Sequence, residues 1–329
     1  MKYILIILVS LLIPSTVESH IENIENSLQN NNYEIAYEKF NVAISEFDAN
    51  SILYFTGANI AIKLDKLDDA NKYFIKAIEL DNKNKNYRKA QENLLLLKND
   101  ITNVRKTFDS GRLDEAINEY IDLTSKYPNN AIIFYNLGRM YKLNKQYDYA
   151  VNNYKIAAET NPFEDKYKLA IKAIAQQVAK EGDTEYRRQE FDVAIKKYKE
   201  SISYYPDYTI AYFKLARTYF KIKDYDNAIK FLLNFESESY LFRSLAKGTI
   251  GDAYSELKKY SDALEYYLDA ADDNNFTTPI YLFKAGSIAM KINKFSKAEE
   301  LFKRIKLRYP NSPEATNIDA YISKAAASN

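Results

Sequence analysis

The sequence predicts an all-α fold: a right-handed superhelical solenoid of about eight helix-turn-helix repeats, closed by a C-terminal capping helix. The first observation behind this prediction is a set of alanines in the same local context, namely Ala36, Ala70, Ala116, Ala150, Ala194, Ala228, Ala263 and Ala298. The second is their spacing, because five of the seven gaps are 34 or 35 residues and the other two are 46 and 44. A period near 34 residues is typical of helical hairpins that stack on their neighbours.

The clearest repeat spans residues 131–162. When its residues are counted from Ala131 as position 1, small residues stand at positions 8 and 20, which are Gly138 and Ala150. Positions 4, 7, 8 and 11 share one helical face, as do positions 20, 24 and 27. We therefore expect Gly138 and Ala150 to face each other where two antiparallel helices meet. Pro162, at position 32, cannot continue a helix and is expected to end the second one.

This pattern resembles the tetratricopeptide repeat (TPR), which reads W-x2-L-G-x2-Y followed by A, F/Y, A and P. Outside the clearest repeat, the residues that carry the resemblance include Tyr54, Ala58, Phe74, Tyr120, Tyr198, Leu215, Ala216, Tyr219, Gly251, Tyr254, Tyr267, Leu282, Gly286 and Phe302. The resemblance covers nearly all of residues 21–312. The copies around Ala116 and Ala194 keep mainly their second helices, and the copy around Ala36 follows a short first helix.

The predicted organisation is a signal peptide over residues 1–19 and a solenoid over residues 20–329. The expected repeats cover approximately residues 21–50, 51–84, 85–130, 131–164, 165–208, 209–243, 244–278 and 279–312, with a capping helix over 313–326. Ser312 and Pro313 suit the cap and the first position of that last helix. The two long gaps indicate either an elongated first helix or a short extra helix in residues 85–109 and 165–190. Each is interpreted as a tolerated insertion or as a bend in the superhelix.

The N-terminus has the pattern of a secretory signal. Lys2 precedes an apolar run over residues 3–13, and Val17 and Ser19 suit cleavage before His20. We expect export to the periplasm or cell envelope, and the abundance of Asn, Lys, Ile and Tyr favours a bacterial one. The alternative is an uncleaved anchor in the inner membrane, which is the one membrane contact expected. The chain has no Cys, so it carries neither disulfides nor a lipid-bearing cysteine.

The last 50 residues or so add a second resemblance. The run Tyr309-Pro310-Asn311-Ser312, with the helix before it, is similar to the final repeats of bacterial envelope TPR proteins. These include the Tol–Pal-associated periplasmic protein and the outer-membrane assembly lipoproteins. The missing lipid-bearing cysteine is a departure from the lipoproteins.

Composition argues against several other classes of protein. The formal net charge is +1, without the clustered basic excess of a nucleic-acid surface. With no Cys, a single His and 7 Gly, the chain lacks the residues for thiol chemistry, a multi-His metal site or a glycine-rich phosphate loop. We therefore predict a non-enzymatic protein with no cofactor, no nucleic acid partner and no small-molecule substrate.

The resemblance implies a concave face lined by first helices, on which positions 5, 9 and 12 stay open for a partner. The candidate partner-binding residues there are Phe55, Asn59, Arg105, Phe108, Tyr135, Arg139, Tyr186, Phe213, Arg217 and Phe220. Arginine and aromatic side chains are common anchors of interfaces, so this face favours an acidic, apolar peptide. The alternative is that these residues cover contacts between helices. Chaperone-binding TPRs carry Lys and Asn at positions 5 and 9 of one repeat, and that clamp is absent.

The sequence thus predicts a protein–protein interaction scaffold of the bacterial cell envelope whose partner is unidentified. Two alternatives remain open: a self-associating structural module, and an accessory or regulatory subunit of an envelope enzyme that acts on the cell wall.

Overall fold

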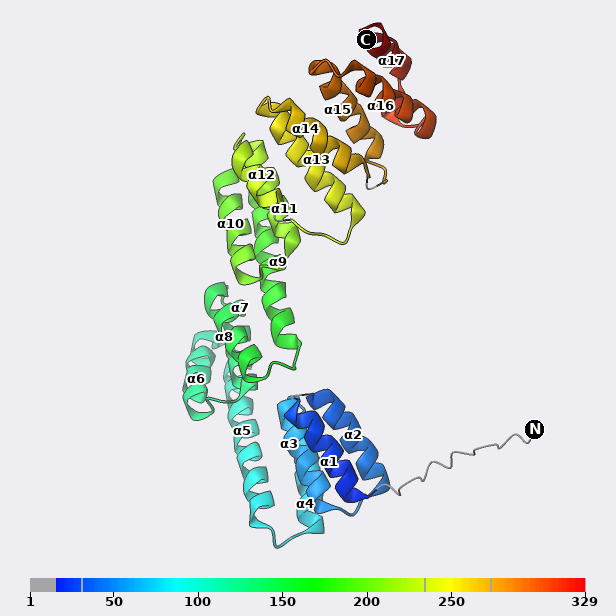
Figure 1. Cartoon of the computed structure of the whole chain (residues 1–329). Helices are drawn as coiled ribbons and strands as arrows, with labels where there is room; N and C mark the ends of the chain where they lie inside the picture. The colour runs from blue at the N-terminus through cyan, green and yellow to red at the C-terminus, as the bar shows by residue number, and fades with distance from the viewer. Residues whose placement is uncertain (1–15, 31, 234, 273, 329) are drawn as a thin grey trace, which may run out of the picture. The chain divides into compact units, whose positions relative to one another are not determined.

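The computed structural model describes residues 16–30, 32–233, 235–272 and 274–328, and within these ranges it holds helices and no strand. Consecutive helices pair into hairpins (Figure 1). The predicted all-α repeat fold is therefore confirmed. The chain forms two compact units, Met1–Ala170 and Ile171–Asn329.

Unit 1 contains four hairpins and the start of the helix that follows them. Its helices are α1 (Val17–Gln29), α2 (Tyr33–Glu46), α3 (Ser51–Lys63), α4 (Leu67–Leu80), α5 (Lys85–Asp109), α6 (Leu113–Lys126), α7 (Ala131–Leu143) and α8 (Tyr147–Thr160). The core between the helices takes one large ring from the second helix of most hairpins, such as Phe40, Phe74 and Tyr154. These rings stand at position 24 of their repeats, as the pattern predicts.

Unit 2 takes most of α9 (Lys166–Arg187) and the remaining hairpins. Its other elements are α10 (Phe191–Tyr204), α11 (Thr209–Lys221), α12 (Tyr225–Leu233), α13 (Tyr240–Glu256), α14 (Tyr260–Asp272), α15 (Thr278–Lys291), α16 (Phe295–Arg308), the 3-10 turn η1 (Pro313–Ala315) and α17 (Ile318–Ala327). Tyr198, Tyr267 and Phe302 occupy the same core position here.

One residue with positive φ separates the two helices in seven of the hairpins. These residues are Asp65, Gly111, Lys145, Gln189, Lys223, Lys258 and Asn293. Each stands two residues after the first helix and two before the second. A left-handed residue ends a helix and reverses the chain. Only one of the seven is a glycine, so helix packing imposes this conformation on side chains that ordinarily avoid it.

The close approach predicted for the clearest repeat is present. A Cβ atom added to Gly138 would lie 3.1 Å from the backbone oxygen of Ala150 and 2.7 Å from the Tyr154 ring. Gly251 stands in the same relation to the ring of Tyr267, also at 2.7 Å. The absence of a side chain at these positions lets the two helices of a hairpin touch.

The two long gaps contain elongated helices, which was one of the two predicted alternatives. Helix α5 runs for 25 residues and α9 for 22, each as a single element. Neither breaks at its internal pair of turn-favouring residues, Asn99-Asp100 in α5 and Gly182-Asp183 in α9. Gly182 is tolerated inside α9 because the Tyr198 ring packs against its backbone at 2.8 Å from the Cβ position.

Both ends of the solenoid differ from expectation. The first helix is not short: α1 has 13 residues, as many as α3, because Thr16 and Ser19 cap it reciprocally. The capping helix begins at Ile318 and not at Pro313. The chain makes only a 3-10 turn after Pro313, and Asn317 then adopts a left-handed conformation with φ of 60°. Asn enters this region more readily than most residues.

The predicted signal peptide falls largely on residues 1–15, which lie outside the described residues. The bond between Ser19 and His20, where cleavage is predicted, lies within α1. Across the described part of the chain, no helix combines the length and apolar character needed to cross a membrane.

Candidate partner-binding face

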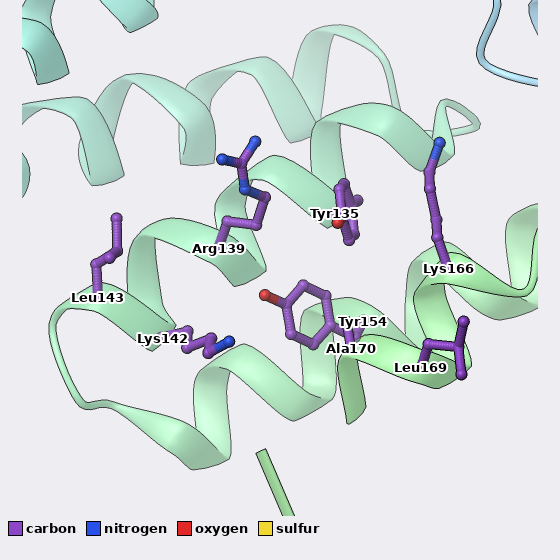
Figure 2. A pocket seen from close by; sticks show the side chains of 8 residues that line it. All are labelled: Tyr135, Arg139, Lys142, Leu143, Tyr154, Lys166, Leu169 and Ala170. Carbon is purple, nitrogen blue, oxygen red and sulfur yellow. The ribbon is translucent and has the colours of Figure 1, made fainter. Parts of the chain in front are cut away.

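A pocket of about 500 Å³ opens in unit 1 between α7, α8 and the first turn of α9 (Figure 2). Two of its residues, Tyr135 and Arg139, are predicted site residues from positions 5 and 9 of α7. The other lining residues are Lys142, Leu143, Tyr154, Lys166, Leu169 and Ala170. The structure thus brings aromatic, cationic and apolar side chains to one concave site.

The charges at this pocket are unequally neutralised. Lys166 pairs with Asp65 at 2.5 Å and with Glu164 at 3.7 Å. Arg139 and Lys142 have no carboxylate partner among the described residues, and Arg139 is exposed. Two cations at the pocket are therefore available to a carboxylate from outside.

The phenol of Tyr154 lies at the floor of the same pocket. In Figure 2 its hydroxyl points to the side where Arg139 and Lys142 lie. Burial raises the pKa of Tyr154, and the nearby Tyr135 adds to this shift, whereas the charge of Arg139 opposes it. Tyr154 therefore stays neutral and can donate a hydrogen bond beside the two cations.

Arg105 and Arg139 both act on the pKa of Tyr120; that they share one face stays a prediction. Burial raises the pKa of Tyr120, and the charges of Arg139 and Arg105 both lower it. Arg105 is largely exposed and makes one weak ion pair with Asp109 at 3.8 Å. Both arginines therefore lie near Tyr120 within unit 1.

The remaining predicted residues of unit 1 are less open. The Phe55 ring stacks on Tyr87 with centroids 4.6 Å apart, and Phe108 packs against the core around α5, α6 and α7. Asn59 is exposed. The two phenylalanines thus fit the alternative prediction, in which position 5 and 12 side chains cover contacts between helices.

In unit 2 the position 9 side chain is an aspartate in two repeats, and each aspartate is already paired. The Tyr198 hydroxyl donates to Asp183 at 2.8 Å, and Lys214 from the next hairpin reaches the same carboxylate at 2.5 Å. The second cluster repeats this arrangement, with Tyr267 donating to Asp252 at 2.6 Å and Lys284 also at 2.6 Å. These carboxylates hold neighbouring hairpins together.

The predicted residues of unit 2 divide between core and surface. Phe213 is only 6% exposed and packs with Phe235 and Phe242, so the prediction that it offers an open ring needs correction. Arg217 is exposed and lies over the Phe213 ring at 5.8 Å.

Tyr186 and Phe220 are half-buried by edge contacts to Phe191 and Tyr225. Within this unit, burial raises the pKa of Tyr198, the nearby Asp183 and Tyr186 add to this shift, and the charge of Arg217 opposes it.

Sequence reasoning missed the side of the pocket that α9 supplies. Lys166 and Leu169 precede the recognisable repeat and belong to the extra turns of α9. The 44-residue gap was the available signal, since an elongated helix must project residues beyond the regular hairpin. No group of three or more His, Cys, Asp or Glu that could hold a metal ion occurs in the described ranges.

Comparison with known proteins identifies the repeats. One sequence model described as Tetratricopeptide repeat matches residues 105–165, 179–234 and 249–314, and a second with the same description matches residues 53–84. An Hsp70-Hsp90 organising protein of Plasmodium falciparum (isolate 3D7) is 30% identical over 104 residues, which cover 30% of this chain. The matched stretch spans 18% of that relative's length.

Two solved structures are also similar at low identity. The C-terminal part of a TPR repeat-containing protein from Cytophaga hutchinsonii is 15% identical, with a TM-score of 0.37, over 90% of this chain and 98% of that chain. The Pseudomonas aeruginosa protein pilF is 15% identical, with a TM-score of 0.35, over 68% and 96%. The sequence matches, which extend over more than half of the chain, place it in a family: the chain belongs to the tetratricopeptide repeat family.

Proposed function

We propose that this protein is a non-enzymatic scaffold of the bacterial cell envelope that binds acidic, apolar segments of other proteins at the pocket of unit 1. TPR repeats are protein-binding modules, and the observation that carries the finer proposal is the pair of unpaired cations, Arg139 and Lys142. A partner carboxylate placed between them would also meet the Tyr154 hydroxyl. Hydrogen bonds that involve a charged group are about twice as strong as neutral ones.

The apolar half of the proposed partner follows from the rim of the pocket. Leu143 is 54% exposed and Leu169 is 59% exposed, one on each side of the pocket. Large apolar side chains on a surface beside charged groups favour a partner that buries them. A segment with an acidic residue next to Leu, Ile or Phe matches both the cations and the exposed leucines of the pocket.

The name of the curated relative suggests chaperones as another class of partner. The sequences of the first helices of unit 1 argue against a chaperone partner. Phe55 with Asn59 and Tyr135 with Arg139 occupy positions 5 and 9, so the Lys that a chaperone clamp needs at position 5 is missing from both. We therefore propose acidic, apolar segments and not chaperone tails.

The binding proposal is tested by fluorescence anisotropy with two labelled peptides, one containing Asp and Leu and the other with Asn in place of Asp. We expect the full chain to bind the Asp peptide more tightly, and the difference to shrink at high salt. The double variant Arg139→Ala/Lys142→Ala should lose this preference. The matched control, Lys106→Ala/Lys155→Ala, removes two exposed charges elsewhere in unit 1 and should keep it.

Equal binding of both peptides by the wild-type chain would refute the proposed chemistry. Unchanged binding by a folded Arg139→Ala/Lys142→Ala variant would instead place the partner elsewhere on the protein.

The envelope location is proposed from the N-terminal pattern of Lys2, the apolar run and Val17 with Ser19. Fractionation of cells that express the full chain, followed by N-terminal sequencing, tests it. We expect a mature N-terminus at or near His20 in the envelope fraction. Intact Met1 in the cytoplasmic fraction would contradict the proposal.

A further inference from the structure

The connection between α8 and α9 contacts a turn that lies about 100 residues earlier in the chain. Asn161 donates its side-chain amide to the backbone oxygen of Lys63, and the Tyr167 hydroxyl donates to Asp65. Asp65 is the left-handed residue of the α3–α4 turn. Tyr33, the first residue of α2, meets Phe163 of the same α8–α9 connection with ring centroids 5.1 Å apart. Hairpins that are not neighbours in the solenoid are therefore joined within unit 1.

The contact is buried, which distinguishes it from a surface ion pair. The Asp65 side chain is 7% exposed, and Tyr167 is fully buried. The turns α3–α4, α6–α7 and α8–α9 also enclose a cavity of about 50 Å³, lined in part by Asp65, Asn130 and Asn161. A buried carboxylate needs partners, and within the described residues Asp65 receives them from the Lys166-Tyr167 pair.

Another cluster of Lys, Tyr and Asp in unit 1 lies between adjacent helices. Lys126 and Tyr127 both reach Asp100, at 2.6 and 2.7 Å, and join α6 to α5. That cluster strengthens a contact that the solenoid makes anyway. The Asp65 cluster uses the same chemistry to join the second hairpin to the start of α9, which are far apart in the order of repeats.

Lys166 connects this cluster to the pocket, because it lines the pocket and pairs with Asp65. Its ammonium lies over the Tyr135 ring at 5.6 Å and over the Tyr167 ring at 5.2 Å. We propose that Asp65 is a positioning residue of the partner-binding pocket: through Lys166 and Tyr167 it clasps the first turn of α9 and so holds the α9 side of the pocket in place.

The clasp has a consequence that a plain solenoid lacks. In a stacked array each repeat contacts only its neighbours, so a local perturbation weakens with distance along the chain. The Asp65 clasp makes the α3–α4 turn and the α8–α9 connection open together. Occupation of the pocket should therefore stabilise the α3–α4 turn, because coupling between two sites is reciprocal. This last step rests on the proposed peptide binding; the clasp itself does not.

The experiment compares Tyr167→Phe with Tyr127→Phe in the full chain, since each variant removes one hydrogen bond from a tyrosine to an aspartate. Native-state hydrogen exchange is followed at the amides of residues 60–67 and 160–170, without peptide. We expect Tyr167→Phe to speed exchange in both segments by about tenfold, as the loss of a bond to a charged group does. Tyr127→Phe should leave residues 60–67 unchanged. Asp65→Asn provides a second variant and should loosen the same two segments.

Binding of the Asp and Leu peptide is the second readout. Tyr167→Phe and Asp65→Asn should weaken it about fivefold or more, and Tyr127→Phe should not. Unchanged exchange at residues 60–67 in Tyr167→Phe, or an equal change there in Tyr127→Phe, would overturn the clasp.

If Tyr167→Phe and Asp65→Asn both bind the peptide as tightly as the wild-type chain does, the positioning role of Asp65 is overturned. A wild-type chain that does not bind the peptide would refute the proposed function, while the exchange data would still decide on the clasp.

Discussion

In unit 1 the side chain at position 9 of the fourth hairpin is Arg139, whereas in unit 2 the same position carries Asp183 in one repeat and Asp252 in another. A tyrosine at position 24 lies beside each of them. Next to aspartate, the tyrosine donates a hydrogen bond and a lysine from the following hairpin completes the cluster. Next to Arg139 the described part of the chain supplies no such partner, and the cation lines a pocket.

This difference shows how one repeat position can serve two purposes. An aspartate at position 9 is neutralised inside the protein, so it contributes to the packing of neighbouring hairpins. An arginine at the same position cannot accept the tyrosine's hydrogen bond, and Arg139 is exposed. The helical scaffold is the same in both cases. The side chain at position 9 decides whether its charge is neutralised between hairpins, as at Asp183 and Asp252, or lines a pocket, as at Arg139.

The largest effect is expected where the two units are alike. Ala150→Leu in unit 1 and Ala263→Leu in unit 2 both overfill the close contact within a hairpin, because both alanines are fully buried. Each should lower the free energy of unfolding by about 1–3 kcal/mol. Thermal unfolding followed by circular dichroism measures this, with the exposed Asn152→Leu as the control. A midpoint unchanged by Ala150→Leu would refute the assigned phase of the repeats.

The second prediction separates the two kinds of position 9. Asp252→Ala leaves Lys284 and the Tyr267 hydroxyl without their acceptor, so it should lower the free energy of unfolding by about 1 kcal/mol or more. Arg139→Ala should change it by no more than about 0.5 kcal/mol. Urea unfolding of the two variants gives both values. Equal losses would mean that Arg139 is structural and that the contrast between the units is wrong.

A charge reversal sharpens the contrast further. Arg139→Asp places an acceptor beside Tyr154 and reproduces two members of the unit 2 cluster. We expect it to stabilise unit 1 by about 0.5 kcal/mol, a typical net value for one hydrogen bond, and to abolish binding of acidic peptides. Urea unfolding measures the expected gain in stability, and fluorescence anisotropy measures the expected loss of peptide binding. Tighter binding of an acidic peptide by this variant would contradict the assigned role of Arg139.

The smallest effect concerns acid. Burial raises the pKa of Asp100, but hydrogen bonds from Lys126 and Tyr127 outweigh it, and the net pKa is lowered. The unfolded chain therefore binds a proton on this group more readily than the folded one, so its contribution to stability is complete above the ordinary value near 3.9 and is lost as pH falls through the folded pKa. Asp100→Asn should flatten the acid limb of the stability profile. An identical profile from pH 5 to 2 would contradict this.

Much of the fold could be predicted because its repeat is local. The contact between Gly138 and Ala150 and the ring at Tyr154 follow from helical spacing within 34 residues. The candidate site was only partly predictable: Tyr135 and Arg139 line the pocket, whereas Phe213 is buried in the core. The repeat pattern does not distinguish the phenylalanine from the tyrosine at position 5. Whether the ring is exposed depends on which side chains the next helix packs against it.

The helices, their order and the small-residue contacts follow from periodicity and from neighbours a few turns away, so they can be predicted from the sequence. The tertiary structure alone decided that α5 and α9 are continuous, that Lys166 and Leu169 join the pocket, and that Asp65 meets Tyr167. Those outcomes depend on how hairpins curve relative to one another, which sums many small packing angles. The motif of a single repeat does not contain the information needed to predict these accumulated angles.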